Sequence, residues 1–251
     1  MFRVHPMIIT NDLLIGKILK RYKRFLVDIE LPNGKTVIAH STNTGSMTSC
    51  WEPGDPALIK FIDDPKRKLK YTLLACKRGT TWVGVDTSSP HKLVLELLKS
   101  GKCYGLNGIK ELRSEVKYGS ESSRIDIWGK HQKKEIFIEI KNTTLKRGPW
   151  VSFPDAVTER GTKHLRELQK MIKKGHRAAL VFLIQRNDVT YFDVARDIDP
   201  TYAKELGKAI KNGLEIYPIC VELKVSKTKG RIILKWNPKK ILPFKMMTPK
   251  D

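Results

Sequence analysis

The sequence predicts an α+β protein with two domains, a small antiparallel β-barrel such as the OB-fold followed by an α/β domain with a mixed sheet. Two observations support this prediction. Short apolar runs separated by turn residues fill residues 13–85, with no helical stretch of useful length. Beyond residue 87, helical and strand patterns alternate instead. We therefore expect one domain over residues 1–86 and a second over residues 87–251.

Six short strands are expected in the first domain, and turn signals such as Pro32-Asn33-Gly34 and Arg78-Gly79 separate several of them. The expected strands are Leu14–Leu19, Phe25–Leu31, Thr36–His40, Ala57–Phe61, Tyr71–Ala75 and Trp82–Val85. Strands that follow one another this closely are typical of a small barrel.

The second domain is expected to begin with a helix, because Ser89 is a plausible N-cap, Pro90 suits the first helical position and Gly101 ends the apolar pattern. Alternating elements follow. We expect strands at Ser114–Lys117, Arg124–Trp128 and Ile136–Ile140, a polar segment from Asn142 to Gly161, a helix over 162–174, a strand at Arg177–Gln185, a helix from Asp199-Pro200 to before Gly213, and a hairpin of Val221–Val225 with Arg231–Lys235.

The charge of the chain indicates a nucleic-acid partner. Its 251 residues include 48 basic and 26 acidic side chains, for a net charge of +22, and the isoelectric point is about 9.9. Lysines and arginines that bind a phosphate backbone release its condensed counterions, and a basic excess of this size is the usual electrostatic sign of such binding. A lysine-rich surface that favours solubility or heat resistance is the alternative.

Several other classes of protein find no support in the sequence. No apolar run approaches the ~20 residues of a membrane span, and no signal peptide is evident, so we expect a cytoplasmic protein without a membrane partner. The four cysteines form no Cys-x-x-Cys pair, which argues against structural zinc and for buried free thiols. Nucleotide-hydrolysis and serine-hydrolase motifs are also missing from the sequence.

Acidic residues and a lysine share one face of neighbouring expected strands. Side chains alternate along a strand, so Glu139 and Lys141 point to the same side. Asp126 lies on the preceding strand, and the short link 129–134 brings it near Glu139. The neighbours of Asp126, Ile125 and Ile127, are both expected on the opposite face. Glu115, on the strand before, can join the same face.

Three carboxylates and a lysine suit Mg²⁺ or Mn²⁺, both of which prefer oxygen ligands. A metal in such a site activates water for phosphodiester hydrolysis, and a lysine can orient that water or stabilise the developing charge. The alternative is a sheet surface with ordinary ion pairs. Glu-x-Lys alone is not specific, because it also occurs at Glu115-Val116-Lys117 and Glu222-Leu223-Lys224.

Two segments of the first domain are candidates for nucleic-acid contact. The segment Arg21-Tyr22-Lys23-Arg24-Phe25 combines positive charge with rings on which bases can stack, as suits a single or distorted strand, although an exposed hairpin explains it equally. Asn43-Thr44-Gly45-Ser46-Met47 is either a phosphate-contacting loop or a turn. In the second domain, His164 opens a basic helix and either contacts phosphate or lies on the surface.

Several motifs together resemble the sugar fermentation stimulation protein A family. They are His40, Asn43-Thr44-Gly45-Ser46-Met47, Glu115-Val116-Lys117-Tyr118-Gly119, Ser123-Arg124-Ile125-Asp126, Glu139-Ile140-Lys141-Asn142, the run from Phe153 to Gly161, His164-Leu165-Arg166-Glu167-Leu168, Gln185-Arg186 and Asp199-Pro200-Thr201-Tyr202. The resemblance runs from about residue 10 to residue 222. It implies an N-terminal OB-fold and a second domain similar to the PD-(D/E)xK nucleases.

On that resemblance, Asp126 and Glu139 are expected metal ligands, Lys141 the catalytic lysine and Glu115 an additional acid and ligand. Ile125 stands where the wider nuclease superfamily often has proline. The family is described mainly as DNA-binding, with a name that records an effect on sugar metabolism in bacteria. The candidate nucleic-acid-binding residues are Arg21, Tyr22, Lys23, Arg24, Asn43, Arg124, Arg160, Lys163 and His164.

Two hypotheses follow, a Mg²⁺- or Mn²⁺-dependent DNA nuclease and a non-catalytic DNA-binding regulator linked to sugar metabolism. An RNA-binding protein shares the same electrostatics and is the third alternative. The sequence leaves the oligomeric state open, with a homodimer among the alternatives.

Overall fold

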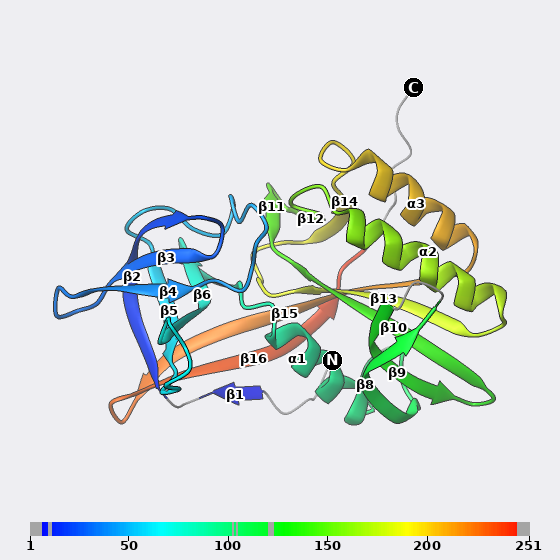
Figure 1. Cartoon of the computed structure of the whole chain (residues 1–251), viewed down its shortest axis with the longest axis horizontal. Helices are drawn as coiled ribbons and strands as arrows, with labels where there is room; N and C mark the ends of the chain where they lie inside the picture. The colour runs from blue at the N-terminus through cyan, green and yellow to red at the C-terminus, as the bar shows by residue number, and fades with distance from the viewer. Residues whose placement is uncertain (1–6, 10–11, 102, 104, 120–122, 245–251) are drawn as a thin grey trace.

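The computed structural model describes residues 7–9, 12–101, 103, 105–119 and 123–244, and shows a small barrel beside a mixed-sheet domain (Figure 1). The barrel strands are β2 (Leu13–Tyr22), β3 (Leu26–Glu30), β4 (Thr36–His40), β5 (Pro56–Phe61), β6 (Tyr71–Arg78) and β7 (Thr81–Gly84). β4 also pairs with β6, in parallel, which brings the two sides of this sheet together. Its core holds inward residues such as Ile18, Val27 and Ile29.

The second domain contains three helices and most of the remaining strands. Its elements are α1 (Ser89–Lys99), β8 (Lys110–Tyr118), β9 (Ser123–His131), β10 (Lys134–Thr143), β11 (Leu145–Arg147), β12 (Trp150–Phe153), α2 (Glu159–Lys173), β13 (Arg177–Ile184), β14 (Tyr191–Val194), α3 (Pro200–Lys211), β15 (Glu215–Thr228) and β16 (Arg231–Ile241). β10, β13 and β15 are parallel to one another, whereas β8, β9 and β16 pair antiparallel, so the sheet is mixed as predicted.

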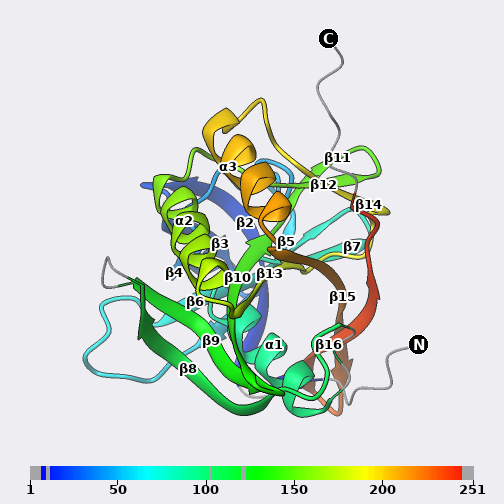
Figure 2. The same ribbon diagram turned by 90° about the vertical axis from the view of Figure 1, so that its right-hand side faces the viewer.

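Helices cover both faces of the second sheet (Figure 2). α1 packs through Leu93, Val94 and Leu97 against one face, in a core cluster that includes Ile127 and Ile138. α2 and α3 pack on the other face, where Leu165 and Leu206 belong to a second cluster. Strand β13, buried almost throughout, contributes alternately to both clusters, as expected for a central parallel strand.

Polar caps fix the start of α2 and α3 near each other. The Thr158 side chain accepts a hydrogen bond from the Gly161 amide at 3.1 Å, and the Asp199 side chain accepts one from the Tyr202 amide at 2.9 Å. Asp199 also accepts a hydrogen bond from the Thr158 amide at 2.8 Å. One buried carboxylate therefore holds the N-terminal ends of both helices in place.

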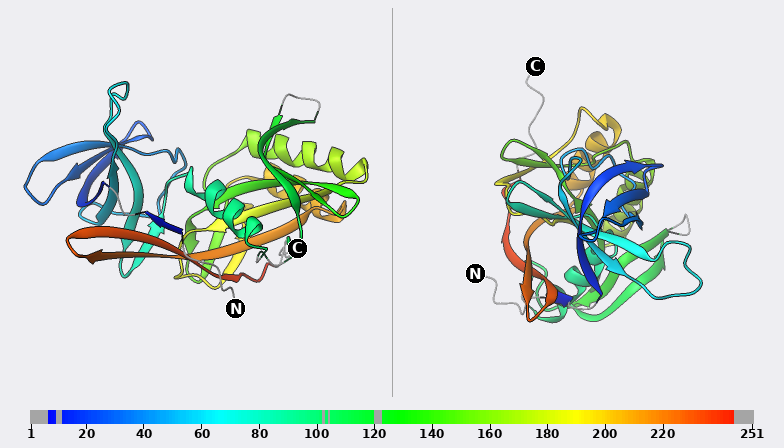
Figure 3. Two further views of the ribbon diagram at one scale, coloured as in Figure 1. Left: turned by 90° about the horizontal axis from the view of Figure 1, so that it is seen from below. Right: turned by 90° about the vertical axis from the view of Figure 1, so that its left-hand side faces the viewer.

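The long hairpin β15–β16 joins the two domains (Figure 3). Leu223 of β15 pairs with Trp82 of β7, so the barrel and the second domain share one continuous sheet. The edge of β16 in turn pairs with β1 (Met7–Ile9) through Leu234 to Trp236.

Two buried polar side chains, Gln185 and Arg186, follow β13, and Arg186 links the two domains. Arg186 is 1% exposed. Its Nη1 donates to the backbone oxygens of Thr144 and Ser49 at 2.8 and 3.1 Å, and its guanidinium forms a two-bond ion pair with Asp188. Gln185 is fully buried, and its Oε1 accepts from the Trp236 indole at 2.8 Å. Ser49 belongs to the barrel domain, so Arg186 fixes the two domains against each other.

The structure confirms the predicted α+β class and also shows elements that the sequence did not predict. The segment from Asn142 to Gly161, predicted only as polar, contains β11 and β12, which form a small second sheet with β14. Helix α2 begins at Glu159, three residues earlier than expected, because Thr158 caps it. The boundary between residues 86 and 87 stays a prediction.

Candidate active site

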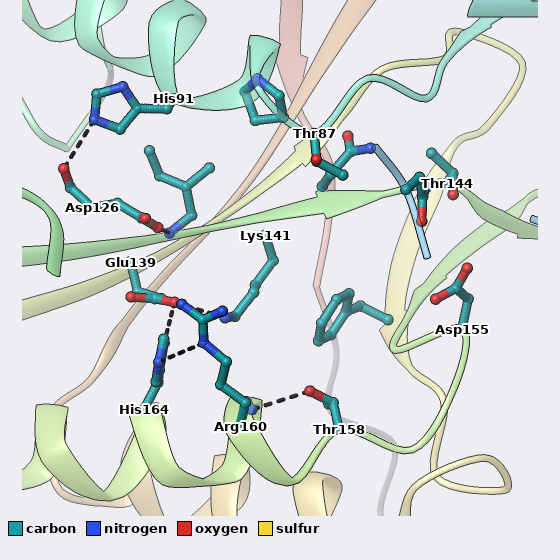
Figure 4. A pocket seen from close by; sticks show the side chains of 16 residues that line it. Thr87, His91, Asp126, Glu139, Lys141, Thr144, Asp155, Thr158, Arg160 and His164 are labelled. Carbon is teal, nitrogen blue, oxygen red and sulfur yellow. Dashed lines mark hydrogen bonds and ion pairs between the residues drawn. The ribbon is translucent and has the colours of Figure 1, made fainter. Parts of the chain in front are cut away.

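A cleft of about 360 Å³ lies where the two domains meet (Figure 4). The C-terminal half of β10 forms its floor, and the starts of α1 and α2 form its walls. The loops that follow β4 and β12 contribute further lining residues. The lining residues are Asn43, Thr87, Pro90, His91, Asp126, Glu139, Ile140, Lys141, Asn142, Thr144, Phe153, Asp155, Thr158, Arg160, Gly161 and His164. The cleft thus contains Asp126, Glu139 and Lys141, which the sequence placed together.

Glu139 is the most buried acid of the cleft, with 2% of its surface exposed. Its Oε1 accepts a hydrogen bond from Lys141 Nζ at 2.7 Å and another from His164 Nδ1. Arg160 Nε donates to His164 Nε2 at 3.4 Å, which assigns the proton of a neutral imidazole to Nδ1. His164 therefore donates to Glu139 and lies buried, and its surface alternative is wrong.

Burial raises the pKa of Glu139, but the charge of Lys141 and the hydrogen bond from His164 outweigh it and leave the pKa below its usual value. Glu139 is thus a carboxylate at neutral pH. Its second oxygen, Oε2, is buried and has no hydrogen-bond partner among the residues that the structure describes. A buried charged oxygen without a partner is costly, so this atom suits a cation.

Asp126 lies beside Glu139, as predicted from the β9–β10 hairpin. The pairing of Ile127 with Ile138, continued by one residue, places Asp126 opposite Glu139. Asp126 Oδ2 accepts a hydrogen bond from the Ile140 amide at 2.6 Å. Burial, and then repulsion by Glu139, raise the pKa of Asp126 to about 6.

The side-chain alternation predicted along β9 is wrong at Ile125. Ile127 packs in the cluster beneath α1, whereas Ile125 packs in the cluster beneath α2 and α3. The regular β9–β10 ladder ends at Ile127, and beyond it the Asp126 carboxylate accepts the hydrogen bond of a β10 amide. The strand therefore departs from regular pleating where it delivers Asp126 to the cleft.

Glu115 does not line the cleft, although its place in β8 is opposite Asp126 in register. Its side chain is exposed, and its backbone has a positive φ of 55°. Within the part of the chain that the structure describes, no three His, Cys, Asp or Glu side chains form a group that could hold a metal. The expected three-carboxylate set is therefore reduced to two acids in the cleft, Asp126 and Glu139.

The loop between β4 and β5 forms the side of the cleft that belongs to the barrel. Arg21 donates to the backbone oxygens of Asn43 and Gly45 at 2.9 Å each and to that of Ser46 at 3.1 Å. From the second domain, Asp155 Oδ2 accepts a hydrogen bond from the Met47 amide at 3.3 Å. Arg21 thus orders the loop, and Asp155 ties it to the second domain.

The other residues predicted to bind nucleic acid lie in different surroundings. Asn43 and Arg160 line the cleft. Lys23 and Arg24 are exposed at the β2–β3 turn, and Tyr22 donates its hydroxyl hydrogen to Asp28 at 3.0 Å. Arg124 is exposed and donates to the Glu115 backbone oxygen, while Lys163 on α2 is half-buried and does not line the cleft.

Two further cleft residues were not assigned to the site from the sequence, which left open whether Asp155 belongs to the site or orders the loop. His91, on the first turn of α1, lies within 3.0 Å of the Asp126 backbone oxygen through Nε2. Asp155 follows β12 and closes the cleft toward the barrel. Neither residue lies in a recognisable spacing with the acids, since loops and a helix from distant parts of the sequence bring them together.

The cleft brings carboxylates and positively charged side chains together above strand β10. Asp126 and Glu139 present carboxylate oxygens side by side, Lys141 and Arg160 supply positive charge, and His164 fixes Glu139. Oxygen donors of this kind fit a hard divalent cation, and the unpartnered Glu139 Oε2 agrees with that fit. Of the helices in the described part of the chain, none is both long and apolar enough to cross a membrane.

Comparisons with known proteins show the family. The family model described as "Sugar fermentation stimulation protein RE domain" matches residues 88–227, and that described as "SfsA N-terminal OB domain" matches residues 19–85. The chain therefore belongs to the sugar fermentation stimulation protein family, as the sequence motifs predicted.

Relatives from other organisms match over most of their length. A sugar fermentation stimulation protein homolog from Rhodospirillum rubrum is 44% identical over 236 residues, which cover 89% of this chain and 95% of the relative. A homolog from Geotalea uraniireducens is 45% identical over 199 residues, covering 79% and 86%. The solved structure of Pyrococcus furiosus SfsA in complex with Ca²⁺ is similar with a TM-score of 0.82 and 25% identity, over 96% of this chain and 98% of that one.

Proposed function

We propose that the protein is a DNA nuclease that uses Mg²⁺ or Mn²⁺ in the interdomain cleft to hydrolyse phosphodiester bonds. The observation that carries this proposal is the state of Glu139, a buried carboxylate with Oε1 bonded to Lys141 and His164 and with Oε2 unpartnered beside Asp126. That arrangement leaves one carboxylate oxygen of Glu139 available to bind a cation. The net charge of +22 supports a polyanionic substrate.

Asp126 and Glu139 would hold the divalent ion. The related Pyrococcus furiosus SfsA was solved in complex with Ca²⁺, which is in keeping with an oxygen-ligand site in this family. Such an ion lowers the pKa of a bound water and neutralises charge on the phosphate. Burial, and then repulsion by Glu139, raise the pKa of Asp126 to about 6. A cation bound between the two acids would relieve that repulsion.

The side chains of this chain have separate roles in the proposed reaction. Lys141, with 16% of its side chain exposed, is held at Glu139 and can orient the attacking water or stabilise the pentavalent phosphorane. Arg160 lines the same cleft and can bind a non-bridging phosphate oxygen. His164 keeps Glu139 in one orientation, in the manner of groups that orient metal ligands.

The test uses labelled single- and double-stranded DNA incubated with Mg²⁺, Mn²⁺ or EDTA, with gel shifts run on the same samples. We expect metal-dependent cleavage that falls at least about 100-fold in Glu139→Gln and Lys141→Ala, with binding retained. The chain offers a matched control in the second Glu-x-Lys strand, where Lys224 and Glu222 form an ion pair of 3.6 Å outside the cleft. Glu222→Gln and Lys224→Ala should leave cleavage unchanged.

Salt-sensitive binding without cleavage of any substrate would instead favour the non-catalytic DNA-binding regulator. If cleavage fell equally in the cleft variants and in the Glu222 and Lys224 controls, the cleft residues would have no specific role in the reaction.

A further inference from the structure

The outer face of strands β2, β3 and β4 exposes rings and apolar side chains. Val27, Ile29 and Val37 point into the barrel core, so the residues that alternate with them point outward. Leu26 of β3 is paired with Tyr22 of β2 on one side and with His40 of β4 on the other. Asp28 is likewise paired with Lys20 and Ile38, so two rows of outward side chains run across the three strands. Phe25 lies in the turn between β2 and β3, and its ring is next to that of His40. We call Tyr22, Phe25, Ile38 and His40 the barrel face.

The barrel face exposes apolar side chains and rings on a protein with a net charge of +22. Phe25 and Ile38 are 42% and 41% exposed. The Phe25 ring lies 6.3 Å from that of His40, and Lys20 Nζ lies 5.5 Å from the centre of the Tyr22 ring. The Lys20 ammonium lies over the Tyr22 ring, and the exposed Phe25 ring is available for stacking. Exposed rings together with positive charge suit a single strand, whose bases stack while its phosphates meet the charge.

The barrel face leads directly into the active-site cleft. β4 ends at His40, and the loop that follows brings Asn43 into the cleft three residues later. Arg21, next to Tyr22 in β2, holds the same loop through its hydrogen bonds to Asn43 and Gly45. A strand bound on the barrel face can therefore continue along this loop to Glu139.

The cleft has a volume of about 360 Å³ and lies where the barrel meets the second domain. Asp155 and the buried Arg186 hold the two domains in this arrangement through the Met47 amide and the Ser49 backbone oxygen. A single extended strand can follow the Asn43 loop into this cleft without the domains parting.

From these observations we infer that the substrate is a single-stranded stretch of DNA, bound on the barrel face and led along the Asn43 loop into the cleft. This inference rests on the proposed nuclease function and specifies its substrate. Free ends, flaps and gaps are the forms in which duplex DNA offers such a strand.

Binding and cleavage are tested separately so that each can fail alone. Fluorescence anisotropy in EDTA compares a single strand, a blunt duplex and a duplex with a single-stranded flap, all of one sequence. We expect Phe25→Ala to weaken single-strand binding roughly 5- to 150-fold, as for the loss of one stacked base, and Phe25→Trp to restore it. Blunt-duplex binding should change less than about twofold.

Leu14→Ala is the matched control, because Leu14, on β2, is also an exposed apolar residue but lies in a different groove, beside the β15–β16 hairpin. It should leave all three affinities unchanged. Cleavage in Mn²⁺ should map to single-stranded segments and to the flap junction.

Internal cleavage of the blunt duplex at the rate of the single strand would overturn the inference and still support a nuclease. Phe25-dependent single-strand binding without any hydrolysis would refute the nuclease proposal and retain the binding path. Single-stranded RNA bound and cleaved in preference to DNA would overturn the assignment of the substrate.

Discussion

Replacing Arg186 by alanine should weaken the whole protein, because this side chain holds both domains. The change removes a two-bond ion pair with Asp188 and the hydrogen bonds to the backbone oxygens of Thr144 and Ser49. Removing one partner of a buried charge pair costs about 3–5 kcal/mol of the free energy of unfolding. For a chain of this length that corresponds to a drop in Tm of roughly 6–20 °C.

Urea denaturation followed by tryptophan fluorescence measures the loss, and Arg147→Ala provides the matched control. Arg147 also forms a two-bond ion pair, with Asp197, but the two side chains are 44% and 62% exposed. Exposed pairs contribute about 0–1 kcal/mol. If Arg186→Ala costs no more than Arg147→Ala, the domains are not held together by the buried arginine.

Two further variants test the cleft. Burial raises the pKa of Asp126 from 3.8 to about 6, so the folded protein keeps a proton that the unfolded chain has released, and stability falls as pH rises through this window. Asp126→Asn should remove that fall and raise the free energy of unfolding by up to about 3 kcal/mol at pH 7. Urea denaturation in EDTA from pH 4 to 7.5 measures the effect. A difference from the parent protein that does not change with pH would contradict this prediction. A Cβ at Gly45 would lie 2.4 Å from the Asp155 carboxylate oxygens. Gly45→Ala should therefore lower the free energy of unfolding, measured by calorimetry, by about 1–3 kcal/mol, whereas Thr44→Ala should leave it almost unchanged. Equal losses in the two variants would mean that the loop adjusts freely.

The architecture was predictable where local patterns decide it. Strand runs such as Thr36–His40 and the Asp199 cap depend on neighbours in sequence, and the structure confirms them. Helix α1 begins one residue earlier than predicted, at Ser89, and Ser88 rather than Ser89 occupies the N-cap position. The strands β11 and β14 were not predicted, because each is too short to show a periodic pattern and exists only by pairing with β12. Pairing between distant segments leaves no local sequence signal.

The candidate site divides in the same way. Asp126, Glu139 and Lys141 share a hairpin, so alternation and a short turn suffice to bring them together. Asp155 and His91 reach the cleft only through the tertiary fold, and no spacing reveals them. For Arg21 the sequence indicated a role but not the contacts of the side chain. Its charge indicated a phosphate contact, whereas in the structure its guanidinium donates hydrogen bonds to backbone oxygens of the β4–β5 loop.

The hairpin β15–β16 has a consequence for the order in which the protein can form during synthesis. Strand β7 finds its neighbour β15 only after more than a hundred further residues have left the ribosome, and β1 must wait for β16. Until then the barrel carries an open strand edge, which is a site for pairing with other chains. The nascent protein therefore completes its first domain last, and contacts so distant in sequence slow folding.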